Sequence, residues 1–222
     1  MEKHTPYFNV LEAVQKKGDC ALCFLEKKAV HSYFDSLLYE NVNNSVVRNV
    51  LRQSRGYCPY HAHHLAAFHD ALALSILYKE QVLLAASFLE KAASHKNISQ
   101  EWTKHDSCPA CRQTAQIRHH YADILAEGMA EPEMREAFLT NFTICLNHLL
   151  MVMDRLHDDN LKKELTRKMC ERLVNLAGRL EQYCQDSQKN AVGEVVDSPH
   201  RFAWREAVAI AVGLKDTFEP LL

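Results

Sequence analysis

The chain contains one pattern of possible metal ligands twice, and this pattern constrains the fold more than any other feature. Each copy has two cysteines separated by two residues, and then, after more than thirty residues, a cysteine and a histidine with the same separation. The first copy comprises Cys20, Cys23, Cys58 and His61, and the second comprises Cys108, Cys111, Cys145 and His148. Because internal repeats indicate repeated structural units, we expect two similar units, each holding one metal ion.

The similarity extends beyond the cysteines and histidines. The first two ligand positions differ by 88 residues between copies and the last two by 87. His31 and Tyr33 also have counterparts 88 residues later, whereas the counterpart of Arg48 lies 87 residues later. One insertion or deletion between Leu37 and Arg48 explains the change. Duplication of a whole helical hairpin is the simplest interpretation.

The sequence predicts an all-α fold. With only 6 glycines and 6 prolines in 222 residues, long helices are favoured over a many-turned β fold. Apolar residues recur at helical spacing along most of the chain. The expected helices cover residues 24–40, 46–55, 59–94, 112–128, 146–157, 160–188 and 199–212, and a further helix has Pro132 in its first turn. The second is capped by Asn43, Asn44 or Ser45, and the stretch from Ala71 to Leu89 is expected to be a central buried helix.

These elements suggest three regions. Residues 1–95 form a first metal-clipped helical repeat, residues 96–190 form a second, and residues 191–222 form a linker and a C-terminal helix that packs on the body. Within each hairpin we expect an ion pair between its two helices, Asp35 with Arg48 in the first and Asp123 with Arg135 in the second. The recurring histidines and tyrosines either line a pocket or fill the hairpin.

The expected ligand sets, with three cysteines and one histidine each, are typical of zinc. In this interpretation each ion joins the two ends of one hairpin. The cysteine–histidine pair lies at the start of a helix, where the cysteine side chain is favoured as thiolate. An iron–sulfur cluster and a reversible dithiol are the alternatives. The repeat selects His61 over His63, His64 and His69, although His63 or His64 remains a possible ligand. Cys170 and Cys184 lie outside the repeat and are expected to be buried thiols.

Composition narrows the remaining possibilities. The net charge is −2 and no basic stripe is present, which argues against nucleic-acid binding. The N-terminus has no apolar signal segment, and the stretch from Ala71 to Leu89 contains too many polar residues for a membrane span. We therefore expect a cytoplasmic protein without a membrane partner, whose cysteines hold metal rather than form disulfides.

Several segments resemble an uncharacterised family of bacterial Cys/His-containing helical proteins, a domain of unknown function. They are Cys20 to Cys23, Phe34 to Asn43, Val47 with Arg48, Gly56 to Cys58 with His61, and the late Ala203, Trp204, Ala207 and Gly213. The resemblance covers nearly the whole chain and implies a bacterial, cytoplasmic, metal-binding protein. It implies no activity.

Three functions are compatible with these patterns. The first is a binding or adaptor module that is stapled by structural zinc and presents a surface to a protein partner or a second copy. The alternative is a redox- or metal-responsive protein that uses an iron–sulfur cluster or switchable thiolates. An enzyme is the least favoured, because no nucleophile triad or phosphate loop is present and four protein ligands leave zinc no open position.

Overall fold

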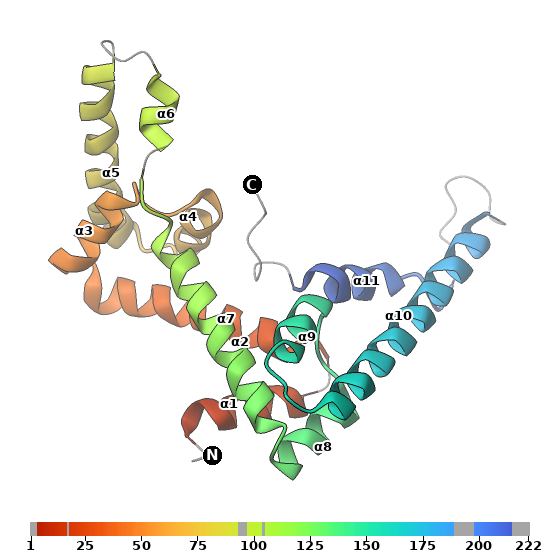
Figure 1. The fold of residues 1–222 in the computed structure, drawn as a ribbon. Coiled ribbons are helices and arrows are strands. Elements are labelled where there is room, and N and C mark those ends of the chain that lie inside the picture. The colour runs from red at the N-terminus through yellow and green to blue at the C-terminus, as the bar shows by residue number, and fades with distance from the viewer. Residues whose placement is uncertain (1–3, 17, 93–96, 104, 189–197, 215–222) are drawn as a thin grey trace. The chain divides into compact units, whose positions relative to one another are not determined.

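In the computed structural model, the described part of the chain is helical and contains no strand. It comprises residues 4–16, 18–92, 97–103, 105–188 and 198–214 (Figure 1). The helices are α1 (Thr5–Gln15), α2 (Ala21–Ser36), a π-helix (Leu37–Asn41), α3 (Ser45–Gln53), α4 (Pro59–Ala66), α5 (Ala71–Ala92), α6 (Ile98–Thr103), α7 (Pro109–Gly128), α8 (Pro132–Asn141), α9 (Leu146–Met153), α10 (Asp159–Gln188) and α11 (Ala203–Val212). The all-α expectation is confirmed.

The chain divides into two compact units, one inserted into the other in sequence. The outer unit comprises Met1–Lys27 and Arg118–Leu222, and the inner unit comprises Lys28–Ile117. The divisions fall within α2 and within α7. These boundaries differ from those of the expected regions 1–95, 96–190 and 191–222. The expected regions follow the proposed duplication of the sequence, and they stay a prediction.

The two halves of the sequence have the same helix order, with α2 to α5 corresponding to α7 to α10. Asp70 accepts a hydrogen bond from the backbone N–H of Ala73 at the start of α5, and Asp158 accepts one from Leu161 at the start of α10, 88 residues later. The π-helix Leu37–Asn41 has no counterpart in α7. This π-helix lies where the first half of the sequence has one residue more than the second half. Insertion of one residue into an α-helix produces such a π-helical turn.

Two expected helices differ from those observed. The helix predicted from position 59 to about 94 is two helices, α4 and α5, because His69 adopts a positive φ of 57° and Asp70 then caps α5. The last helix begins at Ala203 rather than at Pro199. Ser198, the expected cap, instead donates a hydrogen bond to Asp186. The expected linker, which begins at residue 191, lies outside the described residues as far as residue 197.

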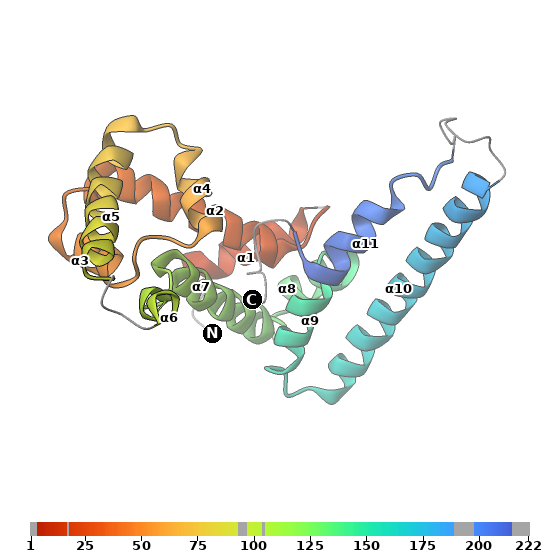
Figure 2. The same ribbon diagram turned by 90° about the horizontal axis from the view of Figure 1, so that it is seen from above.

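The outer unit is built around a core that α1, α8, α9, α10 and α11 share. Helix α1 packs against α8, and α11 packs against both α9 and α10 (Figure 2). Phe138, Leu149 and Leu165 are among the side chains that this core buries almost completely. Burial of this apolar surface supplies the main driving force for the unit. The C-terminal helix therefore packs on the body, as expected.

The inner unit has a smaller core, centred on Phe34. The edge of the Phe34 ring meets Tyr57, His64 and Phe68, with ring centroids 5.3 to 6.2 Å apart. His31, which is exposed, stacks on Phe68 with the ring centroids 4.8 Å apart. Edge-to-face packing of this kind gives the unit an aromatic interior.

The expected hairpin ion pairs are wrong in both halves. Arg48 pairs with Glu80 on α5 instead of with Asp35. Asp123 pairs with Arg155, and Arg135 lies 3.7 Å from Asp158. Arg48 and Arg135 therefore each connect their own helix to an element that lies later in the chain.

Candidate metal centres

The eight predicted ligands gather into two clusters, but not in the expected combinations. The outer site comprises Cys20, Cys23, Cys145 and His148, and the inner site comprises Cys58, His61, Cys108 and Cys111. In each cluster the ligand atoms all lie within 4.8 Å of one another. The pairing of Cys20 and Cys23 with Cys58 and His61 is wrong, as is that of Cys108 and Cys111 with Cys145 and His148. Each copy of the sequence repeat therefore contributes two ligands to each cluster.

Unequal helix lengths explain the exchange. A helix rises about 1.5 Å per residue, so the part of α2 from Cys23 to its end at Ser36 carries the chain about 20 Å away from Cys23. The 9 residues of α3 span only about 14 Å and cannot bring Cys58 back. The same holds for α7 and α8, with 20 and 10 residues. The two sites are therefore nested in the sequence. All four ligands of the inner site lie between Cys23 and Cys145, which belong to the outer site.

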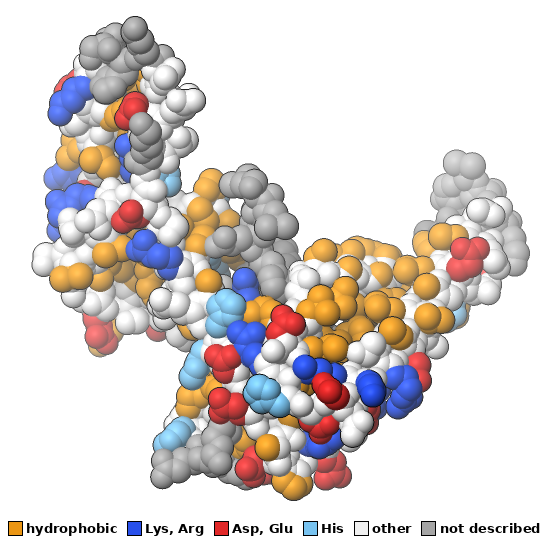
Figure 3. Space-filling model, viewed as in Figure 1, with side chains coloured by type: hydrophobic (Ala, Val, Ile, Leu, Met, Phe, Trp, Pro, Cys, Tyr) orange, Lys and Arg blue, Asp and Glu red, His pale blue; other side chains and the backbone are white. Residues whose placement is uncertain are grey.

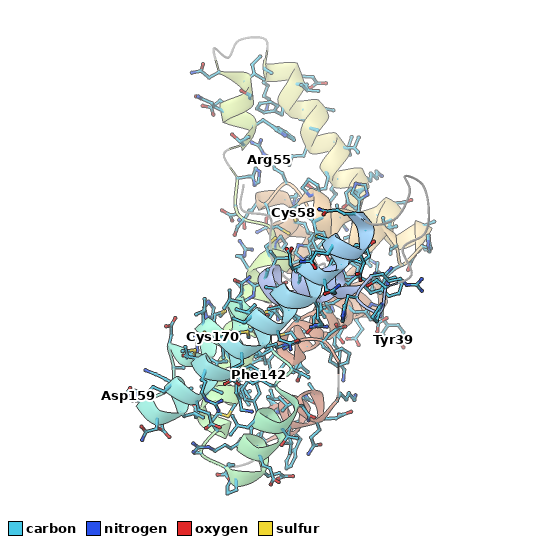
Figure 4. The ribbon with its side chains drawn as sticks, turned by 90° about the vertical axis from the view of Figure 1, so that its right-hand side faces the viewer. Tyr39, Arg55, Cys58, Phe142, Asp159 and Cys170 are labelled. Atoms are coloured by element: carbon cyan, nitrogen blue, oxygen red, sulfur yellow. The ribbon has the colours of Figure 1, made fainter. Side chains whose placement is uncertain are left out.

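Both sites lie at the N-terminal ends of helices. Cys145 is the N-cap of α9 and Cys58, labelled in Figure 4, is the N-cap of α4. Each cysteine is followed three residues later by its histidine. The cysteine pairs occupy the starts of α2 and α7. A helix N-terminus carries partial positive charge, which favours thiolate over thiol. This local prediction from the sequence is confirmed.

The distances between ligand atoms fit a tetrahedral ion. Zinc bonds of about 2.3 Å to sulfur and about 2.0 Å to nitrogen give tetrahedron edges of about 3.8 Å between sulfurs and about 3.5 Å between sulfur and nitrogen. The Sγ atoms of Cys23 and Cys145 are 3.9 Å apart, and those of Cys58 and Cys111 are 3.6 Å apart. Sulfur to histidine Nδ1 distances are 3.2 to 3.7 Å across both sites.

A buried carboxylate supports the histidine of the outer site. The Nε2 atom of His148 lies 2.6 Å from Oε1 of Glu26, which is 1% exposed. Arg118 in turn donates to both oxygens of Glu26, at 3.0 and 3.3 Å. With Nε2–H donating to Glu26, Nδ1 is left as an electron-pair donor toward the cluster. Carboxylate–histidine pairs of this kind orient metal-binding imidazoles and strengthen their basicity.

The C-terminal helix covers the outer site. The backbone N–H of Leu214 donates to Sγ of Cys23 at 3.5 Å, and Glu206 on α11 pairs with Arg172 and Arg179 on α10. A pocket of about 390 Å³ lies beside the cysteines, lined by residues that include Cys20, Cys145, Arg172, Phe202, Glu206 and Ile210. Even so, all four ligand residues are buried.

The inner site has different surroundings. Cys58 and Cys111 are partly exposed, while His61 and Cys108 are buried. At the positions equivalent to Glu26 and Arg118, 88 residues away, the inner unit has Thr114 and Val30. Thr114 donates to its own helix, to the carbonyl of Ala110 at 2.8 Å. The His61 ring instead lies among aromatic rings, with Tyr60 at 4.9 Å and Phe34 at 6.1 Å.

The electrostatics of both clusters favour a bound cation. In the outer site, hydrogen bonds from Cys145 and Cys20 hold the pKa of Cys23 far below its ordinary value. Burial alone would lower the pKa of His148, but hydrogen bonds to Cys145, Cys23 and Glu26 raise it to about 11. In the inner site, the hydrogen bond from Cys111 outweighs burial and lowers the pKa of Cys108 to about 3. Burial raises the pKa of Cys20 in the outer site and of Cys58 in the inner site, so a bound cation is needed before all the cysteines of either site are thiolates.

Glu26 and Arg118 are the site residues that the sequence analysis missed. The sequence contains a signal for both residues. The glutamate three residues after Cys23 and the arginine on the later helix each lack a counterpart of the same type in the other copy of the repeat. The expectation that Cys170 and Cys184 are buried thiols is also wrong, because both are exposed. Cys170 is labelled in Figure 4. His64 packs against Phe34 and belongs to neither cluster, and neither does His63.

The comparisons with known proteins place the chain in a family. A model of a family of unknown function, DUF6062, matches residues 1–187. The chain belongs to this family. It is also 27% identical over 202 residues to an uncharacterised 23.9 kDa protein in the xynA 3′ region of Caldicellulosiruptor sp. (strain Rt8B.4), covering 89% of this chain and 97% of that protein. No solved structure matches. The resemblance to an uncharacterised bacterial family is confirmed.

Proposed function

We propose that the chain is a zinc-stapled helical binding module, in which both ions are structural. The ligand sets support this, because three cysteines and one histidine in tetrahedral arrangement are typical of structural zinc and leave no coordination position open to water or substrate. For the same reason, catalysis at either site is disfavoured. The observation that carries the proposal is the match between the donor distances of both clusters and the edges of a zinc tetrahedron.

In the nested arrangement, each metal ion connects segments that lie far apart in the sequence. Cys23 and Cys145 are 122 positions apart, and Cys58 and Cys111 are 53 apart. An ion that closes a long chain segment restricts the unfolded chain, and ligand atoms from distant segments are brought together only in the folded state. Metal binding and folding of each unit are therefore expected to be coupled.

A surface on α11 supports the role of binding module. Trp204, Val208 and Val212 recur at helical spacing and are each more than half exposed. Arg205 lies over the rings of both Phe202 and Trp204, which leaves a positive charge beside the apolar stripe. Exposed aromatic residues next to arginine are typical of protein-binding surfaces. In Figure 3 hydrophobic side chains gather over α11. We propose a cytoplasmic protein partner with apolar and acidic groups.

The exposure of the inner site favours a second candidate function. Cys58 and Cys111 are partly exposed at a separation of 3.6 Å, so oxidants and chelators have access to two thiolates that can form a disulfide. In this alternative the outer ion is structural, while the inner ion is released when the cell is oxidised or starved of metal. An iron–sulfur cluster at either site is the further variant of this alternative.

Metal analysis of the purified protein tests these candidates. The full chain is expressed in bacteria, purified without oxygen, and examined for bound metals, acid-labile sulfide and visible absorption. We expect two zinc ions per chain, no colour and no sulfide. Iron with sulfide would replace structural zinc with the cluster alternative. Protein that is folded but free of metal would contradict both.

A further inference from the structure

Helix α5 has an apolar face that the described part of the chain does not cover. Only 11% of its most apolar 18-residue window is buried, so the expectation of a central buried helix is wrong. Leu72, Val82, Leu83 and Leu89 are 57% to 74% exposed. They lie on one side of the helix together with Ser75, Lys79, Ala86 and Glu90. We call these eight residues the α5 face.

The opposite side of α5 already has its partners. Ala73 and Leu77 are buried in the inner core, and α3 packs along the helix, with Arg48 pairing with Glu80. The α5 face is therefore not needed to hold the inner unit together. Four large apolar side chains exposed this far leave on the order of 400 Å² of apolar surface in water, which is typical of an interaction site.

Two charges on the α5 face indicate what covers it. Lys79 and Glu90 are its only charged residues, and both are exposed. They are 11 positions apart, which is about three helical turns, so both point to the same side. Val82, Leu83, Ala86 and Leu89 lie between them. A face with a positive end, an apolar middle and a negative end complements itself when a second copy runs in the opposite direction.

We infer that two copies of the chain pair through α5 in antiparallel orientation, with Lys79 of each copy against Glu90 of the other. In this register Leu83 packs against Ala86 of the partner subunit, a large residue against a small one, which lets the helices approach closely. A parallel pair would place Lys79 against a second Lys79 and Glu90 against a second Glu90. Two helices of this length bury about 1,000 Å² in total, at the low end for specific interfaces, so a micromolar dimer is expected.

This dimer is independent of the metal proposal, because none of the eight residues belongs to a cluster. Sedimentation velocity of the metal-loaded full chain between 1 and 100 µM tests it, and we expect a concentration-dependent shift from monomer to dimer. Leu83→Glu is expected to weaken the dimer at least tenfold. Val174→Glu, which places the same charge at an even more exposed apolar residue on α10, is the matched control and should leave the dimer unchanged.

Charge exchange tests the antiparallel register. Lys79→Glu and Glu90→Lys should each weaken the dimer several-fold, and the double variant Lys79→Glu/Glu90→Lys should restore it. Circular dichroism and metal content confirm that each surface variant is folded. A chain that stays monomeric at 100 µM overturns the inference, and a double variant that is weaker than both single ones overturns the register.

A membrane is the competing occupant, because α5 is long and apolar enough, by length and composition, to cross one. Co-sedimentation with vesicles of three parts phosphatidylcholine and one part phosphatidylglycerol separates the two. We expect the wild-type chain to remain in solution. Vesicle binding that Leu83→Glu abolishes, in a chain that does not dimerise, would assign the α5 face to lipid instead.

Discussion

The two candidate metal centres have the same ligand set and the same position at helix starts, but they differ in what surrounds them. The outer site is fully buried, has Glu26 and Arg118 behind its histidine, and lies beneath α11. The inner site has two partly exposed cysteines and an aromatic environment. Ligand type sets which metal is favoured, whereas burial and the groups behind the ligands set how firmly it is held. Two similar motifs in one chain can thus have different lability.

The largest effect is expected from removing ligands in pairs, which tests the nested arrangement itself. Cys23→Ser/Cys145→Ser should lose one metal ion, because both residues belong to the outer site, whereas Cys23→Ser/Cys58→Ser should lose both. Metal per chain by mass spectrometry is the measurement. If Cys23→Ser/Cys145→Ser loses both ions and Cys23→Ser/Cys58→Ser loses only one, the ligands pair within each sequence repeat. The comparison between an outer and an inner site would then no longer hold.

A second prediction concerns the carboxylate that only the outer site has. Glu26→Gln should weaken outer-site zinc about 10- to 100-fold, because the histidine loses its charged hydrogen-bond acceptor. Competition with a zinc-binding dye measures the affinity. Thr114→Val, at the equivalent position of the inner unit, is the control and should have little effect.

Glu26→Gln also leaves Arg118 without its carboxylate, which destabilises a largely buried charge. The double variant Glu26→Gln/Arg118→Met removes that charge as well. If its zinc affinity returns to the wild-type value, the unpaired arginine and not the His148 contact was the cause of the loss.

Third, the difference in exposure predicts two rates of metal release. A chromogenic chelator in excess should remove zinc in two phases of equal amplitude, the faster by about tenfold, because burial limits access to the outer ion. The fast phase should be missing in Cys58→Ser. A single phase for both ions would mean that exposure of Cys58 and Cys111 does not control release.

The smallest effect concerns the helix that covers the outer site. Burial opposes ionisation of Glu206, but Arg179 and Arg172 hold its pKa below the ordinary 4.5. Because the folded-state pKa is lowered, the stabilisation is present above about pH 4.5 and is lost as the pH falls through the folded-state value. The groups are about one-third exposed, so the contribution is below about 1 kcal/mol.

Glu206→Gln should therefore raise amide exchange in α11 only a few-fold at pH 7 and accelerate release of the outer ion slightly. Glu171→Gln, which removes a more exposed pair with Arg167 on α10, is the control. Equal effects of the two substitutions would show that Glu206 does not anchor α11 over the outer site.

The sequence by itself determined the elements whose signals are local. Helical spacing and capping residues placed α3, α7, α8 and α10 correctly, since Asn44 and Asp158 accept the hydrogen bonds that cap their helices. The repeat also identified all eight members of the two clusters, including His61 among its neighbouring histidines. Motif spacing and helix capping depend on residues a few positions apart, which is why sequence patterns report them.

Tertiary structure alone decided which half-sites meet. The two copies of the motif are chemically equivalent, so spacing could not distinguish pairing within a repeat from exchange between repeats. The lengths of α2 and α3 decided it, since a 9-residue helix cannot reverse the path of a 16-residue one. The same long-range geometry placed Glu26 behind His148, moved the expected ion pairs to new partners, and left α5 exposed rather than central.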